Sequence, residues 1–303
     1  MLSKALTYHV ELHRGLGFKF HNQHGLLRSF VSFAEAHGET IVHVDRVLEW
    51  ARQAPSSAQR RNRLVTVRRF ALALHAEDSR HEVPPADALG RDTFRRRMPY
   101  IYTPDEIARL MAATAMLPAA WDRPLTYATL FGLLAATGMR ISEALALHLD
   151  DITTDGLVIR RTKFQKSRLL PLHDTTRSAL DQYLLVRRRM AASAGTLFVS
   201  GKGDVLGYYT VRAVFLRLIR SVDLCGKPGQ RLPRIHDLRH TYAVRSLEQC
   251  GSDPDTVARH LLALSTYLGH AHVTDTYWYL EATPILMARI AEVSEAAYQG
   301  GVA

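Results

Sequence analysis

The stretch YLGHAHVTDTYWYLEATP, residues 267–284, contains two histidines and three tyrosines near the carboxyl end of the chain. His270 lies nine positions before Tyr279, and Tyr277 and Trp278 precede that tyrosine. A phenol is a weak nucleophile near neutral pH, because its pKa is about 10, unless cations or an imidazole favour its ionised form. The chemistry open to this stretch therefore depends on basic groups elsewhere in the sequence.

The stretch ATGMRISEALAL, residues 136–147, places a basic side chain where two predicted helices meet. Gly138 can end one helix, and Arg140 then lies near the start of the next. The helix dipole does not favour a cation there, but an anion bound at this point would attract both the arginine and the free N–H groups. On this stretch alone, a surface arginine or a pair with Glu143 explains the pattern as well.

The stretch RIHDLRHTYA, residues 234–243, predicts the start of a helix. His236 and Arg239 are three positions apart, so they project from one face and can reach the same ligand. A core histidine beside a surface arginine is the ordinary explanation of such a pair. We expect His240 to point elsewhere and to have a structural role.

The basic groups form a set when the chain is read in order. The set contains two arginines, a lysine, two imidazoles and a phenol, without a carboxylate triad. It suits phosphoryl transfer without a metal ion, because fixed cations can offset the charge that develops around phosphorus. Its members are Arg140, Lys163, His236, Arg239, His270 and Tyr279.

Four motifs in this order, TGMRISEAL, TKFQKSRLLPL, HDLRHTYA and LGHAHVTDTYWYL, closely resemble the tyrosine recombinase family, also called phage integrases. The resemblance covers almost all of the catalytic domain, whereas the N-terminal region is similar to the family's core-binding domain in layout and charge. It implies a mainly α fold with a small antiparallel β-sheet. It also implies a C-shaped clamp around double-stranded DNA, acting as a homo-tetramer that joins two recombination sites.

The resemblance also implies a role for each member of the set. Tyr279 would be the nucleophile and would form a 3′-phosphotyrosyl intermediate. Arg140 and Arg239 would hold the scissile phosphate, and His236 and His270 would assist. The scheme needs no cofactor, metal ion or ATP.

A predicted β-hairpin carries the lysine. Strand-like residues 157–162 and 168–172 flank a polar turn. By alignment on RLLPL we assign Lys163 to protonate the departing 5′ oxygen, which a flexible amine on a turn can reach. Lys166 is the neighbouring alternative and a candidate DNA contact.

Composition agrees with a nucleic-acid partner without proving one. The 303 residues include 39 Lys and Arg against 29 Asp and Glu, which gives a net charge of +10. A positive field attracts polyanions, although the same charge could serve solubility. The two cysteines, Cys225 and Cys250, form no C-x-x-C pair and fit a reducing compartment. No signal peptide or membrane-spanning run is evident, so we expect a cytoplasmic protein.

Two domains and a linker are expected. Residues 1–90 predict a helical DNA-binding (core-binding) domain, 91–101 a basic linker rich in breakers, and 102–303 the catalytic domain. The catalytic domain opens with a helix start signal, in which Thr103 is the N-cap and Glu106 follows three residues later.

A basic helix and the linker supply the candidate DNA contacts. The stretch SSAQRRNRLVTVRRFALALHA, residues 56–76, buries apolar residues on one face and has no acidic residue between Glu49 and Glu77. A solvated face is the ordinary explanation, but the missing acidic balance favours phosphate contact. The candidates are Arg60, Arg61, Arg63, Arg68, Arg69, Arg95, Arg96, Arg97 and Lys166.

We therefore interpret the chain as an integrase or resolvase of a mobile element or chromosome-maintenance system. An accessory protein or a partner recombinase could assist it. The alternatives are a type IB topoisomerase-like relaxation enzyme and a catalytically inactive DNA-binding regulator. Tyr277 replaces Tyr279 as nucleophile if the register is wrong by two. A metal site at Cys250, His260 and His272 is disfavoured, because their spacing matches no known ligand pattern.

The final stretch ATPILMARIAEVSEAAYQ, residues 282–299, predicts an amphipathic helix. It can pack on its own core or, as in the family, dock on a neighbouring protomer.

Overall fold

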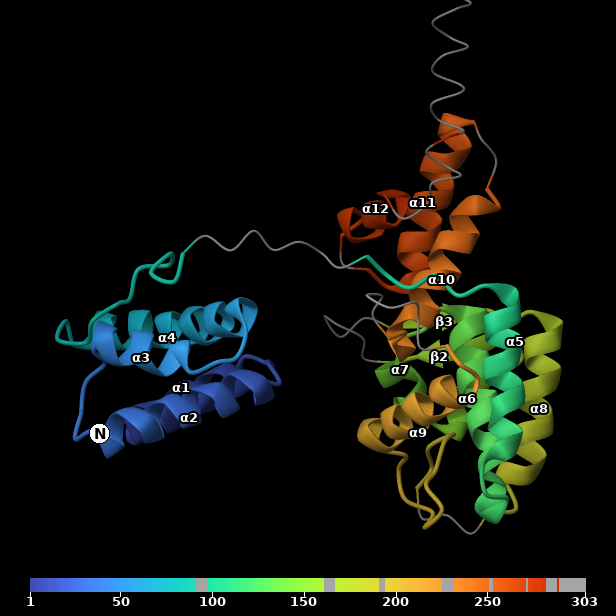
Figure 1. Ribbon diagram of the computed structural model, residues 1–303, viewed down its shortest axis with the longest axis horizontal. Coiled ribbons are helices and arrows are strands. Elements are labelled where there is room, and N and C mark those ends of the chain that lie inside the picture. The colour runs from blue at the N-terminus through green and yellow to red at the C-terminus, as the bar shows by residue number, and fades with distance from the viewer. Residues whose placement is uncertain are drawn as a thin grey trace, which may run out of the picture. The chain divides into compact units, whose positions relative to one another are not determined.

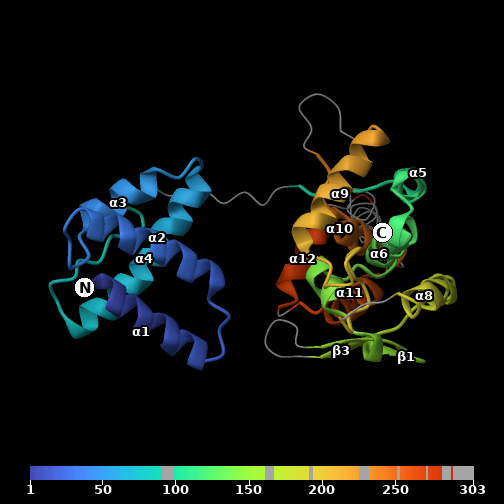
Figure 2. The same cartoon turned by 90° about the horizontal axis from the view of Figure 1, so that it is seen from below.

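A computed structural model describes most of the chain, which divides into two compact units, Met1–Arg97 and Met98–Ala303. Figures 1 and 2 show the two units. The structure describes residues 1–90, 98–160, 167–190, 194–224, 232–250, 253–270, 272–281 and 288.

The described part of the first unit is built from four helices. They are α1 (Leu2–Gly15), α2 (His21–Ala36), α3 (Val44–Arg52) and α4 (Ser57–Glu77). The amphipathic pattern predicted for α4 is confirmed, because Leu64, Val67, Phe70 and Leu74 all lie in the core of this unit. Ser56 starts α4 by accepting a hydrogen bond from the Gln59 N–H, which satisfies one of the free donors of the first turn.

The second unit is mainly helical and has a small antiparallel sheet, as expected for the fold class. Its helices are α5 (Pro104–Ala113), α6 (Arg123–Thr137), α7 (Ile141–Ala146), α8 (Asp174–Arg187), α9 (Tyr208–Ser221), α10 (Ile235–Glu248), α11 (Pro254–Leu268) and α12 (Thr274–Glu281), with short 3-10 turns η1 (Thr114–Met116), η2 (Ala120–Asp122) and η3 (Leu149–Asp151). The described strands, β1 (Ile152–Thr153), β2 (Gly156–Ile159) and β3 (Arg168–Leu170), pair in sequence order, with Ile159 opposite Arg168. The sheet lies at one edge of the unit (Figure 2).

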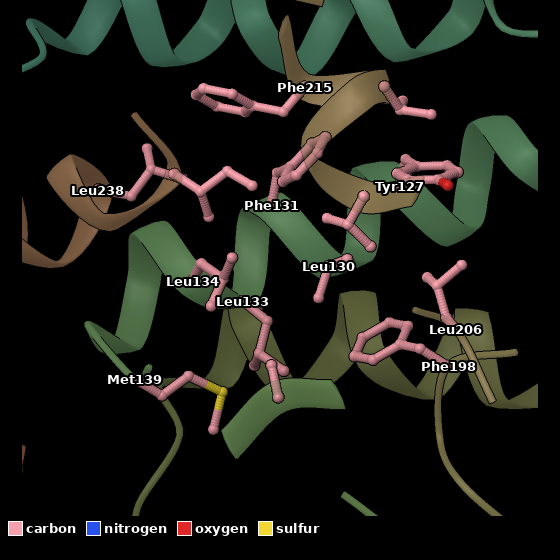
Figure 3. Close-up of a cluster of buried hydrophobic side chains, with 14 of the residues drawn as sticks. Tyr127, Leu130, Phe131, Leu133, Leu134, Met139, Phe198, Leu206, Phe215 and Leu238 are labelled. Atoms are coloured by element: carbon pink, nitrogen blue, oxygen red, sulfur yellow. The ribbon is translucent and has the colours of Figure 1, made fainter. Parts of the chain in front are cut away.

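The central helix α6 organises the core of the second unit. Figure 3 shows its side chains Leu130, Phe131 and Leu134 pointing among residues of other elements, including Phe215 from α9 and Leu238 from α10. All five side chains are buried. This packing holds α6 beside α10, which carries His236 and Arg239, and Arg140 follows three residues after the carboxyl end of α6.

Two predicted helix ends of the second unit are confirmed. Thr103 and Glu106 form a reciprocal capping box at the start of α5. Gly138 ends α6 in the left-handed conformation with φ of 61°. A β-carbon at Gly138 would lie 2.5 Å from the Tyr242 ring, so only glycine fits this turn between α6 and α7.

A second apolar cluster joins α10, α11 and α12, which lie together in the second unit (Figure 1). Val244 and Leu247 of α10 contribute to it, with Leu264 of α11 and Tyr279 of α12. This cluster fixes the short helix α12 against α10, so the predicted tyrosine has a defined position. Among the described residues, no helix combines the length and apolar character needed to cross a membrane.

Candidate active site

Arg140 is held between its own helix and a distant loop. It is the N-cap residue of α7, and its backbone N–H donates to Glu143 Oε2 at 2.9 Å. Its guanidinium donates from Nη1 to Glu143 Oε1 at 2.8 Å and from Nη2 to the Gly269 carbonyl at 3.0 Å. The pair with Glu143 is therefore present, but the contact to Gly269 ties the arginine to the end of α11 as well.

Arg239 is almost completely buried, with 2% of its surface exposed. Its Nη1 donates to the Gly138 carbonyl at 2.9 Å, and its Nη2 donates to the Leu268 carbonyl at 2.8 Å. Arg140 Nη1 also approaches the Leu268 carbonyl, at 3.5 Å, so the two guanidiniums meet at one backbone oxygen. Backbone turns that are far apart in the sequence thus bring the two predicted arginines together.

The charge of Arg140 acts on the buried guanidinium of Arg239. Burial and then the charge of Arg140 lower the pKa of Arg239 to about 10. The group stays charged at neutral pH, but its charged form is less stable than in water. Like charges brought together in a water-poor site are stabilised by an anion that can contact both. The geometry therefore favours a bound phosphate or similar oxyanion.

Glu143 and Arg168 form an inner support for Arg140. Arg168, on β3, donates from both terminal nitrogens to the Glu143 carboxylate at 3.1 and 2.9 Å, and from Nε to the Tyr267 carbonyl at 2.9 Å. Burial would raise the pKa of Glu143, but hydrogen bonds and charges from Arg168 and Arg140 outweigh it and lower the pKa to about 2. The sequence interpretation used the RLLPL stretch only for alignment and missed this role of its arginine.

The turn after α11 places His270 beside the arginines. Gly269 has φ of 67°, and a β-carbon there would lie 2.8 Å from Arg168 Nη1, so the close approach of Arg168 requires glycine. His270 Nδ1 lies 2.7 Å from Thr276 Oγ1, which links this loop to α12. The His270 ring is stacked on the Tyr279 ring with 6.1 Å between their centroids.

Tyr279 lies at the centre of this arrangement. It is 3% exposed, and its charge when ionised raises the pKa of Arg239, which reflects their proximity. Its hydroxyl lies 3.2 Å from His240 Nδ1. Tyr277, the alternative nucleophile, is 51% exposed.

Two imidazoles of α10 approach the tyrosine region together. The rings of His236 and His240 meet edge to face at 4.6 Å. The His236 side chain is exposed to solvent, but desolvation of its ring by neighbouring atoms and the charge of Arg239 lower its pKa to about 4. The prediction that His240 points elsewhere was wrong, because residues four apart on a helix project from the same side. That spacing in HDLRH was the available signal.

The structure does not describe the two candidate lysines or the three candidate arginines of the predicted linker. Lys163, Lys166, Arg95, Arg96 and Arg97 lie outside the described residues. The register of β2 and β3 shows only that the segment carrying both lysines connects strands whose last pair is Ile159 and Arg168.

The first candidate arginines of α4 contact their own unit. Arg60 donates from Nε to the Ala54 carbonyl at 2.8 Å. Arg63 donates to the Trp50 carbonyl at 2.9 Å, and its guanidinium lies 4.7 Å from the centroid of the Trp50 ring. Arg63 is half-buried, so part of its charge is used inside the unit.

The remaining arginines of α4 differ in exposure. Arg68 is half-buried and donates to the Pro84 carbonyl, which holds the segment after α4 against the helix. Arg61 and Arg69 are exposed. These two side chains can reach an external partner without breaking a contact described here.

Within the described part of the chain, no three His, Cys, Asp or Glu side chains are grouped so that they could hold a metal ion. His260, one of the residues considered for such a site, has its Nε2 2.9 Å from Ser246 Oγ. The groups described in the candidate site that can bind a ligand are guanidiniums and imidazoles.

Comparison with known proteins agrees with this geometry. Residues 101–284 match the model of the phage integrase family. A Sinorhizobium fredii protein described by name as an integrase/recombinase is 39% identical over 296 residues, which covers 94% of each chain. Tyrosine recombinase XerD of Corynebacterium glutamicum is 30% identical over 305 residues, covering 93% of this chain and 94% of the relative.

Solved structures share the fold at lower identity. The crystal structure of XerA recombinase covers 97% of this chain and 99% of its own, with 21% identity and a TM-score of 0.53. A lambda integrase dimer bound to a COC' core site covers 92% of this chain and 76% of its own, with 19% identity and a TM-score of 0.63. With the sequence motifs and the matching family model, these similarities show that the chain belongs to the phage integrase family, the tyrosine recombinases.

Proposed function

We propose that this protein is a site-specific DNA recombinase that cleaves and rejoins strands through a 3′-phosphotyrosyl link to Tyr279. The observation that carries the proposal is the meeting of Arg140 and Arg239 at the Leu268 carbonyl, with Tyr279 close to Arg239. Two fixed guanidiniums beside a phenol provide what a phosphodiester needs for attack by an oxygen nucleophile.

The arginines act on the charge of the phosphate. A phosphodiester resists attack because its negative charge repels nucleophiles, and more charge develops on its oxygens in the transition state. Arg140 and Arg239 remain charged at neutral pH and can bond these oxygens. Because backbone carbonyls and Glu143 already fix both guanidiniums, little reorganisation is needed when DNA binds.

The bond changes then conserve energy. The Tyr279 oxygen forms a bond to phosphorus, and the bond from phosphorus to the 5′ oxygen breaks. We propose Lys163 as the donor of the proton that this oxygen takes up, with Lys166 as the alternative. The phosphotyrosyl ester retains the energy of the original bond, so a 5′ hydroxyl of another strand can attack it without ATP.

Double-stranded DNA is the proposed partner. The solved relatives include XerH bound to its difH substrate and lambda integrase bound to a core site. The net charge of +10 and the exposed Arg61 and Arg69 support a polyanionic partner for this chain. We further propose that a homo-tetramer on two sites acts on a mobile element in the cytoplasm. Strand exchange between two DNA sites would distinguish it from a topoisomerase, which reseals the same strand.

The test uses a nicked oligonucleotide from which the cleaved 5′ end diffuses away, so the covalent complex accumulates. Tyr279→Phe should bind this DNA with unchanged affinity and give no complex, because it lacks the attacking oxygen. Tyr277→Phe is the matched control and should form the complex, with the modified peptide containing residue 279 identified by mass spectrometry. A complex that persists in Tyr279→Phe would refute the assignment.

A further inference from the structure

The Tyr279 hydroxyl already has an imidazole partner within the fold. His240 Nδ1 lies 3.2 Å from the hydroxyl oxygen, and the two side chains are 9% and 3% exposed. A hydrogen bond of this length between buried groups defines a direct route for a proton.

Packing on three sides fixes the His240 ring. It meets the rings of His236, Trp278 and Tyr279 at centroid distances of 4.6, 5.1 and 5.5 Å. His240 lies on α10, and Trp278 and Tyr279 lie on α12, so the contact between these two helices sets the distance from imidazole to phenol. Among the described residues, the titratable or charged groups beside this pair include His236, which meets His240, and His270 and Arg239, which lie near Tyr279.

The other two imidazoles are placed for different contacts. His270 Nδ1 lies 2.7 Å from Thr276 Oγ1. His236 lies beside Arg239, and its described ring contact is with His240, which it meets edge to face at 4.6 Å. Of these three side chains, His240 is the one whose ring nitrogen is described at hydrogen-bond distance from the tyrosine oxygen.

We propose that His240, in the tautomer with its proton on Nε2, accepts the phenolic proton of Tyr279 during DNA cleavage. This inference rests on the proposed function and assigns one further catalytic residue to it. As the Tyr279 oxygen bonds to phosphorus, its proton passes to Nδ1 and the imidazole becomes a cation. The 5′ oxygen takes its proton from the separate donor, and on rejoining, the proton on Nδ1 returns to the phenol. The bound phosphate offsets the cation that forms near Arg239.

The decisive variant is His240→Asn. Its Oδ1 can take the place of Nδ1 and accept the same hydrogen bond, but an amide cannot take up a proton at neutral pH. With the nicked substrate, His240→Asn and His240→Ala should both cleave about 100- to 10,000-fold more slowly than the parent protein, at unchanged DNA affinity. If His240→Asn cleaves at the parent rate, His240 only positions the phenol and the proposal fails.

A matched control comes from another histidine paired with a hydroxyl. His260 on α11 has its Nε2 2.9 Å from Ser246 Oγ. His260→Asn should leave cleavage unchanged. Thermal unfolding of both variants separates loss of chemistry from loss of fold.

A more acidic phenol provides an independent test. With 3,5-difluorotyrosine at position 279, the nucleophile loses its proton more easily, so His240→Asn should recover at least about tenfold in cleavage rate. No recovery would contradict the proposal.

The parent background gives a test that does not depend on folding of a variant. In the parent protein, the cleavage rate should fall at acidic pH because His240 becomes protonated. The midpoint of this fall should therefore be the same with tyrosine and with 3,5-difluorotyrosine at position 279. A midpoint that moves with the acidity of the phenol would assign the fall to Tyr279 and overturn the inference. If the parent protein forms no adduct at all, the proposed function itself fails, which is a different outcome.

Discussion

The two units use arginine in different ways. In the second unit, Arg140 and Arg239 each bond to carbonyls at turns more than 100 residues away in the sequence. In the first unit, Arg63 bonds within its own helical unit, while Arg61 and Arg69 are exposed on α4. A guanidinium fixed by several segments suits one phosphate in one position, whereas exposed guanidiniums create a field along a duplex.

The largest effect should follow from removing a fixed guanidinium. Arg239→Ala should lower the cleavage rate by about 100- to 1000-fold or more, since the charge developing on phosphorus loses a prepositioned donor. Arg239→Lys should recover little, because an amine cannot contact the Gly138 and Leu268 carbonyls as a planar fork does. Single-turnover cleavage measures both, with exposed Arg188→Ala as the control. If Arg239→Ala cleaves at the parent rate, the fixed arginines of the second unit do not act on the phosphate in the way proposed.

The support behind Arg140 should affect stability as well as rate. The side chains of Arg168 and Glu143 are 12% and 9% exposed, and breaking such a pair leaves a buried carboxylate short of partners. We expect Arg168→Met to lower the free energy of unfolding by about 3 kcal/mol. Denaturant titration of the full chain measures this, and a loss below about 1 kcal/mol would show that Arg168 is dispensable.

The same variant carries a pH signature. The pKa of Glu143 is lowered from 4.5 to about 2, so its contribution to stability is present above pH 4.5 and is lost as the pH falls towards 2. Removing Arg168 should flatten the dependence of unfolding free energy on pH in this window. An unaltered slope would mean that Arg140 alone holds the carboxylate.

A smaller effect is expected from the exposed arginines of α4. Replacing Arg61 and Arg69 by alanine should weaken DNA binding and reduce the slope of log affinity against log salt by up to about 2, because fewer counterions are released. Cleavage of saturating DNA should not change. The matched pair Arg63→Ala and Arg68→Ala should instead lower stability, since these side chains bond to the Trp50 and Pro84 carbonyls. If the variant lacking Arg61 and Arg69 and the variant lacking Arg63 and Arg68 show equal salt slopes, the two pairs of arginines do not differ in their contact with DNA.

The smallest effect concerns acid stability of the first unit. Burial, with the charge of His13, lowers the pKa of His9 from 6.5 to about 4. Because the unfolded chain binds a proton that folded His9 does not, stability is full above pH 6.5 and declines as the pH falls towards 4. His9→Phe should reduce the drop in melting temperature between pH 7 and 5, whereas exposed His21→Asn should not. An unchanged drop in His9→Phe would place the acid sensitivity elsewhere.

Local features of the fold could be predicted from the sequence because their causes are local. The capping box of Thr103 and Glu106, the glycine end of α6 at Gly138 and the buried face of α4 all depend on residues a few positions apart. Similarity to known motifs gave the mainly α class with its small antiparallel sheet, which the structure confirms.

The site was less predictable, because its supports come from tertiary contacts. The motifs selected Arg140, Arg239 and Tyr279 as candidates, but no spacing indicates that β3 supplies Arg168 to Glu143 across 25 residues. The contact of His240 with Tyr279 spans 39 residues and depends on how α12 packs on α10. The one sequence signal for a place of His240 in the site was its position four residues after His236 on a predicted helix.

The carbonyl of Leu268 that both guanidiniums share has a consequence for protein synthesis. A ribosome that has made the chain only up to α10 has already produced Arg140 and Arg239, but not the Leu268 carbonyl at which they meet. Tyr279, the proposed nucleophile, is synthesised later still. We therefore expect a chain that ends before α11 not to cleave DNA, because it lacks both the shared carbonyl and the proposed nucleophile.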